Sequence, residues 1–499
     1  MWPFNKKQKT KKRMYAGAAM GRLLNDWLTS STSADSEIKG SIKKLRDRSR
    51  QMARDNEWAK NAVRSLANNV VGEGVRFQSQ VRQLRGSKLD QKSNDAIELA
   101  WEKWKRKQNC DVRGTMAFED IELLLVKSLV ESGEVFVRKI YQVMGDSKVP
   151  MSLEVIEADQ LDDCYNEILK DGSYVKMGVE KNKWGRPIAY HFFEAHPGDD
   201  FQSSIKQRRR IRIPADEILH LFPIDRVGQT RGVPIFAATL MRMNQMAGYE
   251  QAEVISARAT AALMGFIESP EGEVPFDAVQ DGQRVTEFEP GVYKYLGPGE
   301  KVNVPDLHRP SGQFEPFIRA MLRGVSAGVG ISYETISKDY SQSNYSSTRQ
   351  ALLEDRVNYK IIQQWLIRNF HFEIYSEWLD YAVLSGELKL KNYEQNVDFY
   401  KVARWIPRGW SWIDPLKDVQ ANKEAVRCGF KTISEVISEN GGDIEEVFSQ
   451  RQREIEMAED YGLIFDTDPS QMDKKGQTQP DENVSASDSG QNLDAAPPD

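Results

Sequence analysis

The chain has 499 residues, of which 40% are hydrophobic and 28% charged, so it can bury several cores and is not wholly disordered. Its 68 Lys and Arg residues against 74 Asp and Glu give a formal net charge of -6, which disfavours a protein that grips nucleic acid by its phosphates. Three scattered cysteines exclude a disulfide framework and a CxxC metal site and indicate a reducing compartment, and no apolar stretch has the roughly 20 residues of a membrane span.

The N-terminal region is basic: residues 1–60 hold fifteen Lys and Arg against six Asp and Glu. Apolar residues from Ile38 to Val70 recur at three- and four-residue steps and predict one amphipathic helix that ends at Gly72. The positive charge has two interpretations. It is either the solvated face of this helix or an arm that binds phosphate groups.

Residues 75–222 are predicted to be α+β. Helices are expected over 90–107 and over 118–133, followed by short β-branched and aromatic runs separated by turn residues. The segment Lys181–Pro187 is typical of a hairpin connection. An antiparallel sheet is therefore expected.

From Pro234 to about Met264 the chain is rich in alanine and has no strong helix breaker, which predicts a helix about 46 Å long. Its small side chains favour close approach to other long helices. Residues 265–305 are acidic, with eight Asp and Glu against three Lys and Arg, and are rich in turn residues.

A short helix is expected over 313–327, and a longer one begins where Ser347 and Gln350 form a capping-box pattern and continues to about Leu384. Further helices are expected after Asp414-Pro415 and from Thr432. Past Asp466 the composition predicts disorder.

The histidines predict no metal site. His191 and His196 flank Glu194 without the HExxH spacing on a helix, and His220 is expected to be a buried core residue. The adjacent carboxylates Asp162 and Asp163 would point to opposite faces of a strand.

The glycine-rich stretches 296–301 and 324–332 are expected to be turns, because they lack the GxxxxGK[ST] spacing of a phosphate-binding loop. No Ser-His-Asp, Cys-His or GxSxG pattern is found either. The sequence therefore predicts no catalytic residue, no cofactor and no metal.

Taken together, segments spread over about 40–465 resemble the lambda-type family of tailed-phage portal proteins. The stretches that carry the resemblance, in chain order, are "ARDNEWAKNAVRSLANNVVGEGVRFQ" (53–78), "IEADQLD" (156–162), "GRPIAYHF" (185–192), "IPADEILHLFPIDRVGQTRGVPIFAATLMRMNQMAGYEQAEVISARATAALMGFI" (213–267), "GVGISYETISKDYSQSNYSSTRQALLEDR" (328–356) and "WIDPLKDVQANKEAVRCGF" (412–430).

The resemblance implies an elongated α+β portal fold that assembles as a homo-oligomeric ring of twelve subunits at one vertex of a phage head. The implied parts are a flexible basic N-terminal segment (1–37), an α+β wing (38–233), a first stem helix (234–264), an acidic clip (265–312), a second stem helix (313–330), a tunnel loop (331–346), a long wing and crown helix (347–386), a crown (387–466) and a disordered acidic tail (467–499).

A DNA channel must not bind its cargo tightly, because about 27 phosphates face a channel of about 46 Å. A near-neutral stem and an acidic clip fit this requirement. The residues expected at the stem interfaces are Arg242, Glu250, Ala252, Glu253, Arg258 and Ala259, and those expected in the tunnel loop beside DNA are Lys338, Asp339, Tyr340, Gln342, Asn344 and Tyr345.

The acidic clip has two interpretations: it repels DNA at the channel mouth, or, as we favour, it docks a basic face of the terminase. The acids concerned are Glu268, Glu271, Glu273, Asp277 and Asp281.

The resemblance implies a non-enzymatic protein of the virion, present in the host cytoplasm during assembly, with no membrane contact. Its implied partners are double-stranded DNA in transient, non-specific contact, the terminase large subunit, the major capsid and scaffolding proteins, and head-completion or tail-adaptor proteins. Two other hypotheses stay open: a metal-dependent DNA-processing enzyme that uses the acids of 265–305, and an oligomeric scaffold that never contacts DNA.

Overall fold

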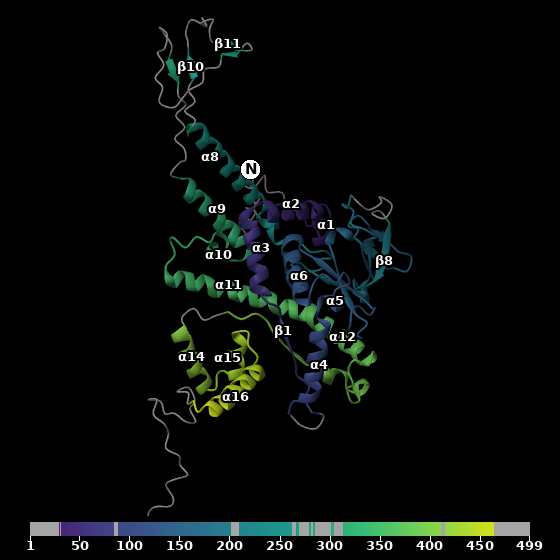
Figure 1. Cartoon of the computed structure of the whole chain (residues 1–499). Helices are drawn as coiled ribbons and strands as arrows, with labels where there is room; N and C mark the ends of the chain where they lie inside the picture. Colours follow the sequence, from purple (N-terminus) through teal and green to yellow (C-terminus); the bar gives the residue numbers. More distant parts are fainter. Residues whose placement is uncertain are drawn as a thin grey trace, which may run out of the picture. The chain divides into compact units, whose positions relative to one another are not determined.

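A computed structural model describes residue 29 and residues 31–83, 88–200, 209–261, 313–410 and 415–463, together with the backbone of four short strands between 266 and 303. The chain divides into two compact units (Figure 1). The first unit comprises Met1–Gly74 and Ser79–Val402, and the second comprises Val75–Gln78 and Ala403–Asp499. In the described part of the chain, no helix combines the length and the hydrophobicity needed to span a bilayer.

Helices make up most of the described first unit. They are α1 (Ala34–Lys39), α2 (Ile42–Asp55), α3 (Glu57–Val70), α4 (Gln91–Trp104), α5 (Lys107–Cys110), α6 (Phe118–Ser132), α8 (Leu240–Ala261), α9 (Phe314–Val329), α10 (Tyr333–Ser337), α11 (Tyr345–Leu366), α12 (Phe372–Leu384) and α13 (Val397–Tyr400), with 3-10 turns η3 (Ala158–Gln160), η4 (Ala215–Glu217), η5 (Ile235–Ala238) and η8 (Tyr393–Gln395) and a π-helical turn η7 (Ile367–His371).

The strands are antiparallel, as the sequence predicted. They are β2 (Val135–Ile140), β3 (Ser152–Ile156), β4 (Glu167–Ile168), β5 (Tyr174–Lys176), β6 (Val179–Lys181), β7 (Pro187–Phe193), β8 (Arg210–Pro214), β9 (Ile218–Leu221), β10 (Phe266–Glu268), β11 (Val279–Gln280), β12 (Gln283–Arg284) and β13 (Lys301–Asn303). One sheet has the order β3-β2-β9 and the other β4-β5-β6-β7-β8. The hairpin expected at 181–187 is the turn between β6 and β7.

Both sheets contribute to one apolar core. Phe136 of β2 packs edge-on against Tyr190 and Phe192 of β7, with ring centroids 5.8 and 5.1 Å away. Ile213 of β8 and Ile218 of β9 complete the cluster. Tyr190 and Phe192 are two residues apart on β7 and therefore lie on the same face of the sheet, toward the core. The expected α+β fold class is confirmed.

The prediction of one helix from Ile38 to Val70 is wrong, because the structure has three helices there (Figure 1). The helix α1 ends at Gly40. At Asn56 the backbone becomes extended, and the Asn56 side chain accepts a hydrogen bond from the Ala59 amide at 3.0 Å, which starts a new helix. Moreover, α1 begins at Ala34 with Asp35 buried, so the segment 1–37 is not wholly flexible.

The other predicted helices are present with shifted ends. α6 stops where Gly133 adopts a φ of 83°, a left-handed conformation that suits glycine. The expected start of a helix at Pro234 is wrong, since a 3-10 turn comes first and α8 begins at Leu240. The expected cap at Ser347 is also wrong: Asn344 caps α11, and Ser347 lies one turn inside it.

α11 and α12 form one continuous rod through the π-helical turn. The extra residue of that turn places His371 inside the protein, where its Nε2 atom contacts the buried carboxylate of Glu122 on α6. The His371 Nδ1 atom lies 3.3 Å from the Leu366 carbonyl oxygen. The long helix is therefore fixed to α6 at its centre.

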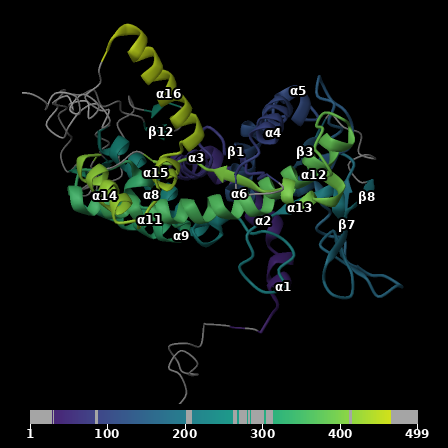
Figure 2. The same cartoon turned by 90° about the horizontal axis from the view of Figure 1, so that it is seen from below.

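The second unit is small. It contains a two-stranded sheet of β1 (Arg76–Ser79) and β14 (Ala403–Ile406) and the helices α14 (Pro415–Arg427), α15 (Ile433–Glu439) and α16 (Ile444–Tyr461) (Figure 2). The helix predicted after Pro415 and the one predicted from Thr432 are confirmed, and Thr432 caps α15 together with Glu435. The sequence analysis did not predict α16.

Candidate functional site

The helices α8 and α9 form the pair that the sequence placed in the stem. Two glycines of α9 allow them to touch: a Cβ atom on Gly324 would lie 1.9 Å from Nη1 of Arg242, and one on Gly328 would lie 2.4 Å from Cγ2 of Thr239. The glycines are one turn apart on one face of α9. The expectation that 324–332 is a turn is therefore wrong up to Val329, and only Gly330, with a φ of 80°, ends the helix.

Aromatic residues fasten the other end of this pair. The ring of Tyr249 on α8 lies 5.8 Å from Phe314 and 4.7 Å from Phe317 of α9, measured between centroids. Glycine contact at one end and aromatic contact at the other fix how the two helices run together. At 22 residues, α8 is about 33 Å long, shorter than the sequence suggested.

The predicted stem residues do not share one environment. Ala252 and Arg258 are exposed, Arg242 lies over Gly324, and Glu253 is buried. The near-neutral charge of the stem stays a prediction, and within one copy Glu253 does not face solvent. The side chain of Ala259 lies outside the described residues.

Glu250 is half-buried on α8. Burial raises the pKa of its carboxyl above the ordinary value, and the negative charge of Glu57, at the start of α3, adds to the effect. Its environment is therefore less favourable to a charge than water would be.

One exposed side of α8 carries small and apolar side chains together with the polar Gln245. Met241, Gly248, Ala252 and Ile255 are all exposed and recur at spacings of seven, four and three residues. This spacing puts them along one side of the helix. Nothing in the described part of the chain lies within 4 Å of a Cβ built on Gly248. Another helix can therefore approach this side closely.

The segment expected to be a tunnel loop, 331–346, contains helix α10 and the first turn of α11. Asp355 of α11 anchors it: its carboxylate accepts hydrogen bonds of 2.7 Å from the Ser332 amide, the Ser332 hydroxyl and the Thr335 hydroxyl. From the other side, the side-chain amide of Asn61 donates to the carbonyls of Thr335 and Ile336. Only a short turn after α10 is left as a loop.

Three of the six residues expected beside DNA brace this turn. Asp339 accepts hydrogen bonds from Ser341 and from the Tyr333 hydroxyl, which hold its pKa at about 2. The side-chain oxygen Oε1 of Gln342 accepts a hydrogen bond from Arg319 of α9, and Asn344 caps α11. Lys338, Tyr340 and Tyr345 are exposed. Three of the six residues therefore brace the turn, and two of these three, Gln342 and Asn344, are exposed as well.

The acidic clip is mostly outside the described residues, including Glu271, Glu273, Asp277 and Asp281. Glu268 belongs to β10, where its backbone is the partner of Lys301 on β13. β11 and β12 form a second short antiparallel pair.

A buried ionic cluster holds the root of α8. The carboxylate of Glu134, just before β2, accepts hydrogen bonds from Arg231 Nε at 2.9 Å and from the Gly232 amide at 2.9 Å, and His220 Nε2 lies 3.0 Å from it. Arg46 of α2 lies 3.2 Å away. Burial alone would raise the pKa of Glu134, but Arg231 and His220 lower it well below its ordinary value. Burial likewise lowers the pKa of His220, which confirms the expected core histidine.

The glycines beside this cluster let two chain segments cross. A Cβ on Gly232 would lie 2.1 Å from the Gly133 carbonyl oxygen. The sequence analysis missed Glu134, Arg231 and both glycines. The one available signal was the glycine that ends α6.

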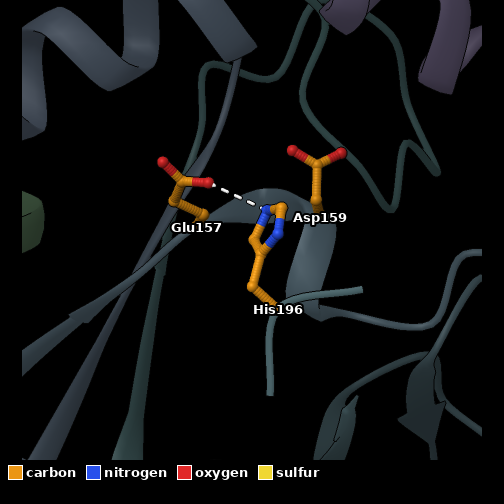
Figure 3. Close-up of side chains that lie close together, drawn as sticks. All are labelled: Glu157, Asp159 and His196. Atoms are coloured by element: carbon orange, nitrogen blue, oxygen red, sulfur yellow. Dashed lines mark ion pairs between the residues drawn. The ribbon is translucent and has the colours of Figure 1, made fainter. Parts of the chain in front are cut away.

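The histidines and acids do not form the arrangement considered in the sequence. His191 lies 3.0 Å from Glu180, and Glu194 lies 3.6 Å from Arg209. His196 instead lies beside Glu157 and Asp159, whose ligand atoms are all within 4.8 Å of one another (Figure 3).

The carboxylates of this cluster already have partners. His196 Nε2 is 3.1 Å from a Glu157 oxygen, and Asp159 pairs with Arg46 and Arg50. The arginines supply the positive charge that a cation would bring.

The expected opposite orientation of Asp162 and Asp163 is wrong. The two residues lie in a turn rather than a strand, and together with Cys164 they place ligand atoms within 4.8 Å. Asp162 pairs with Arg210 at 2.7 Å and Asp163 with Arg46 at 3.7 Å, so each carboxylate already faces an arginine.

Comparison with known proteins identifies the family. The family described as "Phage portal protein, lambda family" matches residues 20–363. A "Probable portal protein" of Halomonas phage phiHAP-1 is 31% identical over 467 residues, which cover 92% of this chain and 89% of that protein. "Portal protein B" of Escherichia phage lambda is 22% identical, with 88% of each chain covered. "Portal protein" of Escherichia phage N15 is 23% identical, with 89% of this chain and 91% of that protein covered.

Among solved structures, a chain in "Neck of native GTA particle computed with C12 symmetry" matches with a TM-score of 0.42 and 14% identity, covering 81% of this chain and 93% of that one. The family match spans well over half of the sequence. The chain belongs to the lambda family of phage portal proteins, and its function is that of a phage portal protein.

Proposed function

We propose that copies of this chain form a ring around a DNA channel at one capsid vertex, through which the genome enters during packaging and leaves at ejection. Twelve copies is the number that the family resemblance implies. The ring would also nucleate procapsid assembly and join head to tail. It would reside in the virion and, before that, in the host cytoplasm.

The observation that carries this proposal is the exposed side of α8. A ring in which each subunit contacts two neighbours needs a surface that another copy can approach, and Gly248 and Ala252 provide one. The α8–α9 pair projects this surface on a rigid support. We assign α8 and α9 to the stem for this reason.

DNA contacts in this proposal come from the exposed groups of the loop. Lys338, Tyr340 and Tyr345 would touch the duplex, while Asp339 and its neighbours hold the turn in shape. One cation in each copy gives transient, non-specific attraction. A channel lined by many more would hold the phosphates too strongly for DNA to slide.

The acidic segment 265–312 is assigned to the clip, and we assign to it the docking of the terminase large subunit. Its excess of Asp and Glu suits a basic docking face on the motor, because complementary charge sets encounter and register. In this proposal the portal is not an enzyme, and the motor is a separate chain.

Electron micrographs of the purified full-length chain test the proposal. We expect annular particles whose mass is an integral multiple of 57.0 kDa. A chain that stays monomeric at all concentrations and in procapsid extracts would refute the ring. Divalent-metal-dependent DNA cleavage by the same sample would support an enzyme instead, and particles that fill with genome without this chain would support a scaffold.

The clip assignment has its own test in a packaging assay. Replacing four of its acids by lysine should stall packaging while rings still form. The four positions are Glu268, Glu271, Glu273 and Asp277. Normal packaging yield from the variant would contradict the assignment.

A further inference from the structure

The helices of the second unit lack a core of their own. α14 and α15 contain no buried residue, and among the described residues of α16 the buried one is Ala458. With lengths of 13, 7 and 18 residues, they are helices that need packing partners to persist in water. The described residues of the unit, 75–78, 403–410 and 415–463, do not supply these partners in a single copy.

Large apolar side chains of these helices and their connections face solvent instead. Phe430 is 84% exposed, Leu416 80% and Tyr461 76%. Ile433, Phe448 and Met457 are also more than half exposed. Such a concentration of exposed apolar surface on so few residues marks an interaction site.

Hydrogen bonds and ion pairs connect the elements of the unit, including Arg76 of β1 with Glu446 of α16 at 3.1 Å, so its surface is preorganised rather than covered. Arg404 of β14 donates hydrogen bonds to the Ser434 and Ser438 hydroxyls of α15. Lys431 links to Asn422 of α14 and to Glu439 of α15. These bonds hold the helices in place while leaving their apolar sides open.

Charge indicates which molecule covers this surface. α14 contains three basic and two acidic residues, whereas α16 contains two basic and six acidic ones. One unit thus offers a slightly positive helix and a strongly negative helix. Two different, complementary faces on the same chain are what a side-by-side contact between identical copies requires.

We propose that α14–α16 of each copy pack against α14–α16 of the next copy, and that this segment gains its stable packing when the ring assembles. The inference rests on the proposed ring and adds that the ring supplies the missing core of the second unit. Coverage by the chain's own first unit, or by another head protein, is the alternative that the following experiment separates.

Hydrogen–deuterium exchange on the full-length chain, as monomer and as assembled ring, tests this inference. We expect amides of residues 415–463 to exchange at least about 100-fold more slowly in the ring, since burial of two large apolar side chains supports a factor of that size. Amides of α6, which lies in the core of the first unit, should not change and serve as the internal reference.

The double variant Leu416→Asp and Phe448→Asp should lose the slow exchange of residues 415–463. The matched control is Leu99→Asp, because Leu99 on α4 is 76% exposed and lies in the first unit. The control should keep the slow exchange. If the double variant also kept it, direct apolar contact between copies would be refuted.

Three further results would overturn the inference. Slow exchange already present in the monomer would mean that the chain's own first unit covers the helices. Slow exchange that appears only after other head proteins are added would assign the surface to them. Rings with fast exchange at 415–463 would contradict the inference alone and leave the portal ring intact, whereas the absence of rings in mass measurements would contradict both.

Discussion

The substitution Ala252→Leu tests the assignment of the exposed side of α8 to the contact between copies. Because Ala252 faces solvent in the protomer, the larger side chain displaces nothing there. Alanine and leucine differ by only about 0.2 kcal/mol in helix propensity. The melting temperature of the isolated protomer should therefore change by no more than about 1 °C.

The effect on the ring follows from helix spacing. Packed helices lie about 8–10 Å apart, and small residues allow the lower value. Three added carbon atoms push neighbouring helices apart by about 1 Å, at an overpacking cost of about 1–3 kcal/mol per contact. Each contact should weaken by about 5- to 150-fold. In a ring of twelve, about 1 Å per contact adds about 2 Å to the radius.

Mass photometry over a range of concentrations measures the weakened assembly, and averaged electron micrographs measure the diameter. Ala96→Leu is the control, since Ala96 is an exposed alanine on helix α4. Rings of unchanged diameter and unchanged concentration dependence in Ala252→Leu would refute the role of this side of α8.

The remaining predictions concern stability and are checked by denaturant and thermal unfolding. Gly328→Ala should lower the free energy of unfolding by about 1–2 kcal/mol, because its Cβ would lie 2.4 Å from Thr239 and this overpacking exceeds the gain in helix propensity. Gly248→Ala, where the added Cβ meets nothing, should raise the free energy of unfolding by about 0.5–1 kcal/mol. Equal effects of the two substitutions would contradict the close approach of α8 and α9. Glu134→Gln should cost about 3–5 kcal/mol, because it leaves buried arginine charge uncompensated. The lowered pKa of Glu134 adds stability that is complete above the ordinary value of 4.5 and is lost as the pH falls below it, so the variant should show a flatter decline there. Glu250→Gln should be more stable than the parent at pH 7, by less than about 1 kcal/mol, and no more stable below pH 4, because the raised pKa makes the charged carboxylate costly as the pH rises above 4.5; a destabilised variant at pH 7 would show that the charge is favourable.

The parts of the fold that the sequence predicted are set by local rules. The strands around Tyr190 were predicted from short β-branched and aromatic runs between turn residues, and the end of α6 follows from a glycine in left-handed conformation. The break at Asn56 was missed because both flanking helices share one apolar stripe, so the periodicity continues across the cap. Likewise, Ser347 is a good capping residue, but it takes the N3 position of a capping box whose N-cap is Asn344.

The site was harder to predict because distant residues create it. The stretch 324–332 was predicted to be a turn because its spacing does not fit a phosphate-binding loop, and glycine is unfavourable within helices. Helix α9 nevertheless continues through both glycines, and a Cβ on Gly328 would lie 2.4 Å from Cγ2 of Thr239, the residue before α8. Local spacing also cannot show that Asp339 bonds to Tyr333 or that Asn344 caps a helix. The tunnel-loop residues were therefore treated as equals when half of them brace the turn.

The cluster around Glu134 explains how a slender helix pair can have a fixed direction. Arg231 is fully buried and 97 residues from Glu134 in sequence, and its other donors reach the carbonyls of Met177 and Ala158. Apolar residues of similar size would stabilise the same volume at least as well. Apolar residues would not fix the orientation of the backbone, whereas hydrogen bonds of defined geometry orient the segment that leads into α8. The close contact of Gly232 with the Gly133 carbonyl also prevents these two segments from shifting past each other. In a ring, an angular error in one copy repeats in every copy. A rigid segment before α8 therefore offsets the free-energy cost of desolvating the buried charges of this cluster.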